Sequence, residues 1–241
     1  MTFLNEENLS APFNFYQINQ TRAGMARPAY DLTSYWETAR DVPRGRGFEG
    51  ISAQIQRDLT FLYEKKVSHI ISLSNRLYHT YIDPHVEKIW TEAFGGTFTH
   101  IPTEDHVHGE DAYSPRDGEG VTAEKLLVFY DLIKNSIGLT VVYCGMGEGR
   151  TGAYWLAAAI ADEMGCEEIN EEALNALIDG KIKELGDLFE RGALVNLSAQ
   201  DDEELEAAIR SRGEFWVSDV ESSGVRAQIP LFLELLRTRA L

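Results

Sequence analysis

The chain has 241 residues, of which 44% are hydrophobic, and this is enough apolar material for the core of a single large domain spanning residues 1–241. Its 39 acidic and 22 basic side chains give a formal net charge of −17, which argues against broad binding to nucleic acids or anionic membranes. Two cysteines do not make a disulfide framework and indicate a reducing, cytoplasmic location, and we expect neither a signal peptide nor a membrane span.

The first half of the chain alternates between helical and strand patterns. Residues 51–66 place apolar side chains at helical spacing and end in two lysines, so they predict a helix. Residues 67–73 are apolar and rich in β-branched side chains, which predicts a buried strand in which His69 is a packed residue and not a ligand. The Asp-Pro pair at 83–84 predicts the start of a helix, and residues 97–101 predict a further strand.

A helix followed by a buried strand comes next. Residues 121–136 form an amphipathic pattern with Thr122 near its start, and Gly138 separates it from the apolar run 139–143. A helix that delivers the chain to a buried strand is typical of the crossover in a parallel sheet. We therefore expect an α/β fold whose central, mostly parallel, twisted sheet is flanked by helices, with a helix at 151–164 after the strand.

The segment after that helix is strongly acidic. Acidic side chains far outnumber basic ones between positions 162 and 206, yet leucine, isoleucine and phenylalanine still recur at helical spacing. This pattern predicts acidic amphipathic helices and not disorder. We expect residues 165–215 to be an acidic helical insertion that covers one side of the core. The alternative is that its charge forms an interaction surface for a basic protein partner.

The loop between the strand and the helix carries the chemistry. Glycines let successive backbone N–H groups converge on one anion, the helix N-terminus adds its positive dipole, and Arg150 can hold two phosphate oxygens. The same positive surroundings favour the thiolate form of a cysteine, so we predict that Cys144 is a nucleophile and that Thr151 donates to its sulfur. The predicted phosphate-binding residues are Gly145, Met146, Gly147, Glu148, Gly149 and Arg150.

Residues 144–152 read C-x-x-G-x-G-R-T-G and resemble the signature loop of the cysteine-dependent tyrosine and dual-specificity protein phosphatases, most closely the small atypical dual-specificity phosphatases. The resemblance extends to residues 14–28, as an opening hairpin, and to residues 220–236, as a closing helix. It implies a phosphatase acting on phosphotyrosine, and on phosphoserine or phosphothreonine, through a phosphocysteine intermediate without a metal or organic cofactor. One departure is Tyr143, where the family usually has a histidine that shapes the loop.

The resemblance also implies a general acid between positions 100 and 115. The family has an aspartate a few residues after the strand that precedes the nucleophile's strand, and Asp105 matches that position. Glu104 and Asp111 are the alternatives, and a carboxylic acid there could protonate the leaving oxygen. Three histidines share the segment, but their spacing matches no zinc pattern, so we expect no metal site.

The substrate class is predicted from the side chains of the loop. It contains no lysine, and Glu148 would repel a polyanionic headgroup, so protein phosphoesters are favoured over inositol lipids and RNA 5′-phosphates. Three alternatives stay open: a catalytically weak phosphate-binding recognition module, a lipid or small-molecule phosphatase, and a sulfur-transfer or arsenate-reducing enzyme. Tyr143 keeps the first alternative open. The last would require a partner thiol, and Cys166 is poorly placed to be one.

Overall fold

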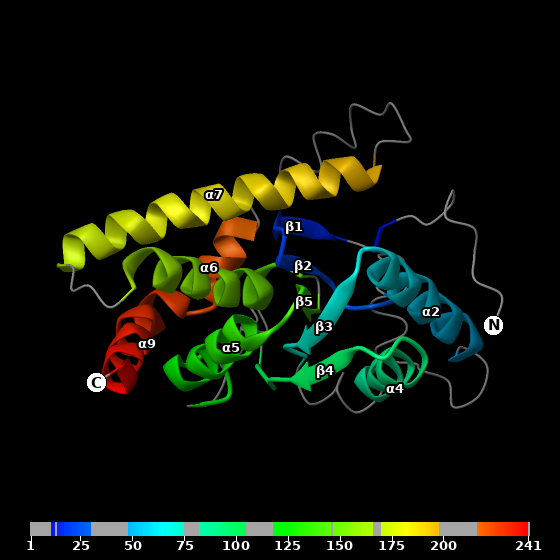
Figure 1. The fold of residues 1–241 in the computed structure, drawn as a ribbon. Coiled ribbons are helices and arrows are strands. Elements are labelled where there is room, and N and C mark those ends of the chain that lie inside the picture. Colours follow the sequence, from blue (N-terminus) through cyan, green and yellow to red (C-terminus); the bar gives the residue numbers. More distant parts are fainter. Residues whose placement is uncertain are drawn as a thin grey trace.

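A five-stranded sheet lies at the centre of the molecule, with helices on both faces (Figure 1). The computed structural model describes residues 11–12, 14–29, 48–74, 82–104, 118–145, 147–165, 170–197 and 216–240. The strands are β1 (Tyr16–Asn19), β2 (Arg22–Ala26), β3 (Val67–Ser72), β4 (Thr97–His100) and β5 (Leu139–Cys144). Their order in the sheet is β1-β2-β5-β3-β4, and only the edge strand β1 runs antiparallel to its neighbour. The predicted α/β class is confirmed.

The helices divide between the two faces of the sheet. They are α2 (Phe48–Glu64), α4 (Asp83–Ala93), α5 (Ala123–Asn135), α6 (Gly149–Met164), α7 (Glu171–Leu197) and α9 (Val225–Ala240). In Figure 1, α2 and α4 cover one face, α5 and α6 lie on the other, α9 packs against α5 and α6, and α7 runs alongside β1 and α6. Residues 216–222 are also helical. In the part of the chain that the structure describes, no helix is both long and apolar enough to cross a membrane.

Two element boundaries differ from those expected. Helix α6 begins at Gly149, so Arg150 lies in its first turn and not in the loop before it. Helix α2 ends at Glu64, so the two lysines expected in its last turn follow the helix. Lys66 has a φ of 62°, and this left-handed backbone ends the helix.

The hairpin predicted from the family resemblance is present, whereas the predicted closing helix, 220–236, is divided: residues 216–222 are helical, a turn follows at 223–224, and α9 begins at Val225. β1 and β2 form the opening hairpin, and α9 lies against α5 at the end of the chain. The Gln228 side-chain oxygen accepts a hydrogen bond from the Ala123 backbone N–H at 3.0 Å. The first turn of α5 therefore has two side-chain acceptors, because Thr122 Oγ1 accepts from the Lys125 N–H.

Alternation along β5 divides the core into two clusters. Tyr143 packs with Trp90 and Met25 on the side of α2 and α4. Val142 and Cys144 pack with the α5 and α6 side of the sheet, where Trp155 is also buried. Every residue of β5 is buried, as expected of a central strand with helices on both faces. Consequently Cys144 and its neighbour Tyr143 face opposite sides of the sheet.

Part of the acidic segment forms one long helix. Helix α7 buries Ile178, Ile182, Leu185 and Phe189 along one stripe and leaves most of its charged residues exposed. The Phe189 ring lies 5.4 Å from the ring of Tyr16 on β1, so the helix covers the edge of the sheet. Positions 166–169 and 198–215 lie outside the described residues. The boundaries of the insertion, its basic partner and the single-domain organisation stay predictions.

Candidate active site

The carboxyl ends of four parallel strands meet at one edge of the sheet. β5 lies between β2 and β3 and ends at Cys144, although β3 and β4 precede it in the chain. In open parallel sheets, such a reversal of strand order opens a crevice in which ligands bind. The segments that follow these strands are therefore the expected walls of a binding site, and they include residues 72–74 and 101–104.

Cys144 lies at the base of the signature loop, which we define as residues 144–150. Its side chain is 3% exposed and forms no disulfide among the described residues. Cys144 pairs with Ala26 in the register between β5 and β2, and the Arg27 N–H donates to the Gly145 carbonyl at 3.1 Å. These contacts fix the start of the loop against β2.

Arg150 folds back from the first turn of α6 over the start of the loop. Its side chain is 4% exposed, and Nη1 donates to the carbonyl oxygens of Thr103 at 2.9 Å and Leu73 at 3.3 Å. A Cβ built on Gly145 would lie 3.4 Å from Nη2, which places the guanidinium beside the residue that follows Cys144. The segments after β3 and β4 thus hold one side of the guanidinium, while its other side lies along the loop.

Gly147 lets the loop pack directly on the backbone of β2. Its φ is +81°, in the left-handed region, and a Cβ there would overlap the Met25 carbonyl and the Ala26 nitrogen. Both features require glycine. This close approach holds Gly147 against the end of β2. The binding of phosphate by the backbone N–H groups of the loop stays a prediction.

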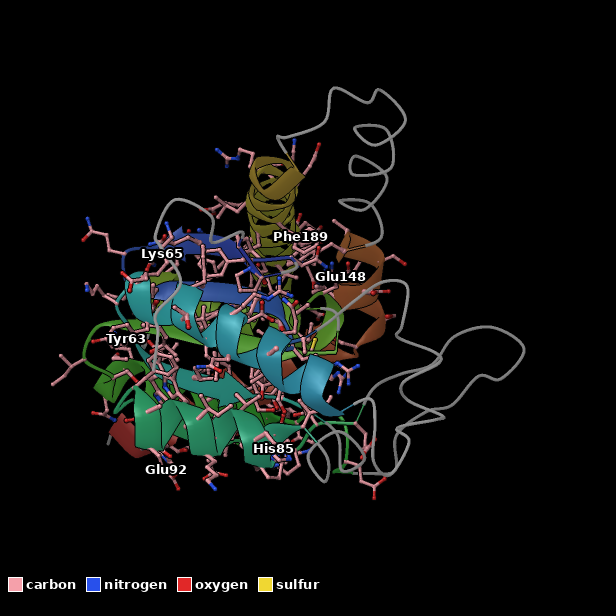
Figure 2. The ribbon with its side chains drawn as sticks, turned by 90° about the vertical axis from the view of Figure 1, so that its right-hand side faces the viewer. Tyr63, Lys65, His85, Glu92, Glu148 and Phe189 are labelled. Carbon is pink, nitrogen blue, oxygen red and sulfur yellow. The ribbon has the colours of Figure 1, made fainter. Side chains whose placement is uncertain are left out.

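The Glu148 carboxylate does not lie at an exposed mouth of the site. Its side chain is 4% exposed and accepts a hydrogen bond from Asn14 Nδ2 at 3.1 Å. Figure 2 shows Glu148 on the same side as Phe189 of α7, whereas His85 and Glu92 lie along α4 on the opposite side. The predicted repulsion of polyanionic substrates assumed a charge that faces the substrate, and this inward orientation weakens that argument.

The remaining predicted site residues are only partly described. Thr151 Oγ1 is buried and has no hydrogen-bond partner among the described residues, so the predicted bond to the Cys144 sulfur is not formed here. Glu104 is half-buried, and its N–H donates to the Glu119 carbonyl. Met146, Asp105 and Asp111 lie outside the described residues. The catalytic roles of all these residues stay predictions.

Candidate metal ligands do not cluster in the described ranges. No group of three or more His, Cys, Asp or Glu side chains there could hold a metal ion. His69 is buried between the hydroxyl groups of Ser136 and Thr99, at 2.9 and 2.8 Å, and burial lowers its pKa. It is therefore a packed strand residue, as predicted. Positions 105–117, which hold two of the three histidines considered above, lie outside these ranges.

A buried polar network behind the loop was not predicted. Tyr143 Oη donates to Asp83 Oδ1 at 2.7 Å, and Ser72 Oγ donates to Asp83 Oδ2 at 2.6 Å. Burial, followed by the Asp83 charge, raises the pKa of Tyr143 well above its ordinary value. In the sequence, Asp83 indicated only a helix start. The carbonyls of Leu73 and Thr103 that hold Arg150 are backbone groups and leave no sequence signal.

Comparisons with known proteins give only distant likenesses. No protein-family model and no curated protein matches this chain. Among solved structures, the core catalytic domain of the PP-IP phosphatase SIW14 from S. cerevisiae has a TM-score of 0.44 and 13% identity, covering 87% of this chain and 97% of that one. P. aeruginosa TpbA gives 0.39 and 13%, covering 94% and 99%, and the Yvh1 phosphatase domain from Chaetomium thermophilum gives 0.40 and 15%, covering 78% and 98%. Similarity this distant carries no argument about activity or substrate.

Proposed function

We propose that this chain is a cysteine-dependent phosphomonoester hydrolase that acts on phosphotyrosine in proteins, with phosphoserine and phosphothreonine as further substrates. The supporting observation is the position of Arg150, which folds back over the loop that begins with Cys144. A nucleophile at the end of β5 and a guanidinium that can bind phosphate with two hydrogen bonds, in the first turn of α6, thus lie buried at the two ends of one short loop.

The first chemical step transfers the phosphoryl group to sulfur. The Cys144 thiolate attacks phosphorus in line, the S–P bond forms and the P–O bond to the leaving group breaks. Arg150 and the backbone N–H groups of the loop hold the equatorial oxygens, where negative charge develops. Asp105 gives its proton to the leaving oxygen. In the sequence, Asp105 follows by two positions the residue whose carbonyl accepts from Arg150, Thr103.

The second step releases phosphate. Asp105, now a carboxylate, takes a proton from water while the water oxygen attacks phosphorus, and the S–P bond breaks to regenerate the thiolate. The Thr151 hydroxyl lies buried next to Arg150 in the first turn of α6 and would donate to the departing sulfur. The two steps balance without a metal, an organic cofactor or a redox partner.

The choice of protein substrates rests on charge. The loop contains no lysine that could meet a second phosphate group, and the chain carries a formal net charge of −17. Substrates with a single phosphate are repelled less by such a surface than nucleic acids or anionic membranes. We therefore propose a phosphorylated protein or peptide as the substrate.

The decisive experiment is a substrate panel assayed with the wild type and with Cys144→Ser. The panel holds peptides with phosphotyrosine, phosphoserine or phosphothreonine, phosphoinositides, nucleotide phosphates and one aryl phosphate. We expect turnover of the phosphotyrosine peptide by the wild type and none by the variant. Turnover retained by Cys144→Ser would refute the nucleophile assignment. Binding of phosphopeptides by the wild type without turnover would establish the recognition module in place of the enzyme.

The general acid needs its own test. Asp105→Asn should lower the rate of hydrolysis of substrates with poor leaving groups, such as alkyl phosphates, much more than that of substrates with good leaving groups. The reason is that only a poor leaving group has to be protonated as it departs. The expected loss is about 10²-fold or more for the poor leaving group. If both kinds of substrate slow equally, Asp105 is not the acid, and the same comparison is repeated with Glu104→Gln and Asp111→Asn.

A further inference from the structure

We propose that Asp83 and Tyr143 are positioning residues for the signature loop. Asp83 connects the strand that carries Cys144 to residues 72–74, and that segment anchors Arg150. The inference deepens the proposed function, since it concerns the same site. The inference can be tested without enzymatic turnover, by following alkylation of the Cys144 thiol and its protection by a bound anion.

Asp83 is a buried carboxylate whose two oxygens are both hydrogen-bonded. It is 1% exposed and opens helix α4. Oδ1 accepts from Tyr143 Oη at 2.7 Å and from Ser74 Oγ at 3.4 Å, and Oδ2 accepts from Ser72 Oγ at 2.6 Å. Position 82 is the N-cap residue of α4, so Asp83 is the first residue of the helix. These hydrogen bonds connect it to the ends of β5 and β3.

The two serines bound by Asp83 flank the residue that holds Arg150. The Leu73 carbonyl accepts from Arg150 Nη1, and the Leu73 N–H donates to the Tyr143 carbonyl at 2.8 Å. The hydroxyl oxygens of Ser72 and Ser74, one on each side of Leu73, lie 2.9 Å apart, and the Ser74 N–H donates to Ser72 Oγ at 3.2 Å. Moving Asp83 would therefore disturb the Leu73 carbonyl, and with it the direction of the guanidinium.

Tyr143 connects the same carboxylate to the nucleophile. It precedes Cys144 in β5, and its ring is fully buried on the opposite face of the sheet. The nearby charges are Asp83, which raises the pKa of Tyr143, and Arg27, which lowers it. Arg27 also donates its N–H to the Gly145 carbonyl, so its segment contacts the signature loop directly. Hydrogen bonds to a buried carboxylate are stronger than neutral ones and hold their donors in one geometry.

The test compares Asp83→Asn and Tyr143→Phe with matched controls. Asp58→Asn removes another buried carboxylate, and Tyr130→Phe removes another tyrosine hydroxyl bound to an aspartate, on the side of the sheet away from Tyr143. Three quantities are measured: kcat and KM on an aryl phosphate, the pH dependence of Cys144 alkylation by iodoacetamide, and protection from alkylation by inorganic phosphate. Urea unfolding gives the stability of each variant.

We expect Asp83→Asn to weaken phosphate protection about tenfold, which corresponds to the loss of one charge-assisted hydrogen bond, and to shift the alkylation profile. Tyr143→Phe should shift the same profile by a smaller amount. The controls Asp58→Asn and Tyr130→Phe should keep phosphate protection and the rate of Cys144 alkylation at each pH within about twofold of the wild-type values. A twofold change corresponds to a few tenths of a kcal/mol.

A purely structural role for the pair gives a different result. Both variants would then lose stability while phosphate protection and the alkylation profile stay those of the wild type, and this would overturn the proposal. If Asp83→Asn does not fold, Ser72→Ala removes one of the same bonds and is tested in its place. Absence of phosphatase turnover in the wild type would refute the proposed function alone, because alkylation and phosphate protection do not require turnover.

Discussion

The Asn14 side-chain amide donates to the Glu148 carboxylate at 3.1 Å and joins the segment before β1 to the signature loop. Both side chains are buried, at 3% and 4% exposure. Asn14 also has a φ of 54°, a left-handed conformation that asparagine adopts more readily than most residues. One residue thus supplies both the turn that leads into β1 and a donor for a carboxylate that would otherwise lose a buried hydrogen bond.

Replacing Asn14 should therefore lower stability through two separable effects. Asn14→Ala removes the donor and strains the backbone, whereas Asn14→Gly removes the donor without strain. We expect a loss of about 1–3 kcal/mol for the missing hydrogen bond in both variants, with a further 1 kcal/mol or so for alanine. Urea unfolding followed by circular dichroism measures both changes. Equal stability of Asn14→Gly and the wild type would show that the bond contributes nothing.

Gly147 offers a sharper test of the loop geometry. Gly147→Ala should abolish phosphate binding, because its Cβ would overlap the Met25 carbonyl and no rotamer can relieve a clash with backbone. Gly165→Ala is the matched control, since Gly165 also has a positive φ, of 57°, but nothing lies within 4 Å of the position that its Cβ would take. It should cost only about 1–2 kcal/mol of backbone strain. Isothermal titration with inorganic phosphate, beside urea unfolding, separates the two outcomes.

Most of the fold was predictable because its elements carry local signals. The apolar run of β5 predicts that strand to within a residue, and the Asp-Pro pair predicts the start of α4. The start of α6 was harder to predict, because its first turn is Gly149 and Arg150 and glycine favours a loop assignment in sequence. In the structure, the chain turns after Cys144 so that the helix begins at Gly149, and Arg150 is therefore inside the helix.

The site was predictable where its residues are contiguous. Cys144, the glycines and Arg150 belong to one short segment, whereas Asp83 and Thr103 reach the site through the sheet topology. The direction of the Glu148 side chain depends on Asn14, a residue 134 positions away, and no local pattern records that contact. Long-range hydrogen bonds of this kind are the part of a site that sequence periodicity cannot predict.

Helix α7 should depend on one aromatic anchor. Phe189 is fully buried between Tyr16, at a ring distance of 5.4 Å, and Trp216, at 6.1 Å. Phe189→Ala should cost about 3–5 kcal/mol and loosen the contact of α7 with β1. The neighbouring Leu188 is only half-buried, so Leu188→Ala should cost clearly less. Thermal unfolding and amide hydrogen exchange of β1 measure both effects, and equal losses in the two variants would contradict the anchor.

Asp58 predicts how stability depends on pH. Burial raises the pKa of Asp58 from 3.8 to about 6, although the Ala29 N–H, Gln54 and the Arg57 charge oppose the shift. The folded protein therefore binds this proton more tightly than the unfolded chain does. Its contribution to stability is complete below pH 4 and is lost as the pH rises through 6, a change of about 3 kcal/mol.

The variant Asp58→Asn isolates this contribution, because asparagine keeps the shape of the protonated acid but does not titrate. The free energy of unfolding of the wild type, minus that of the variant, should fall between pH 4 and pH 7. Asp162→Asn is the opposite control. Burial alone would raise the pKa of Asp162, but hydrogen bonds from Arg22 and Tyr130, together with the charges of Arg22 and Lys134, outweigh it and lower this pKa. The free energy of unfolding of the wild type, minus that of Asp162→Asn, should rise with pH over the acidic range. The salt-bridged carboxylate stabilises the folded state only when it is ionised. Urea titrations of the three proteins at each pH measure both slopes. A flat difference for Asp58→Asn would show that folding does not shift the pKa of Asp58, and a rising difference would show that folding lowers it, so either result contradicts the prediction.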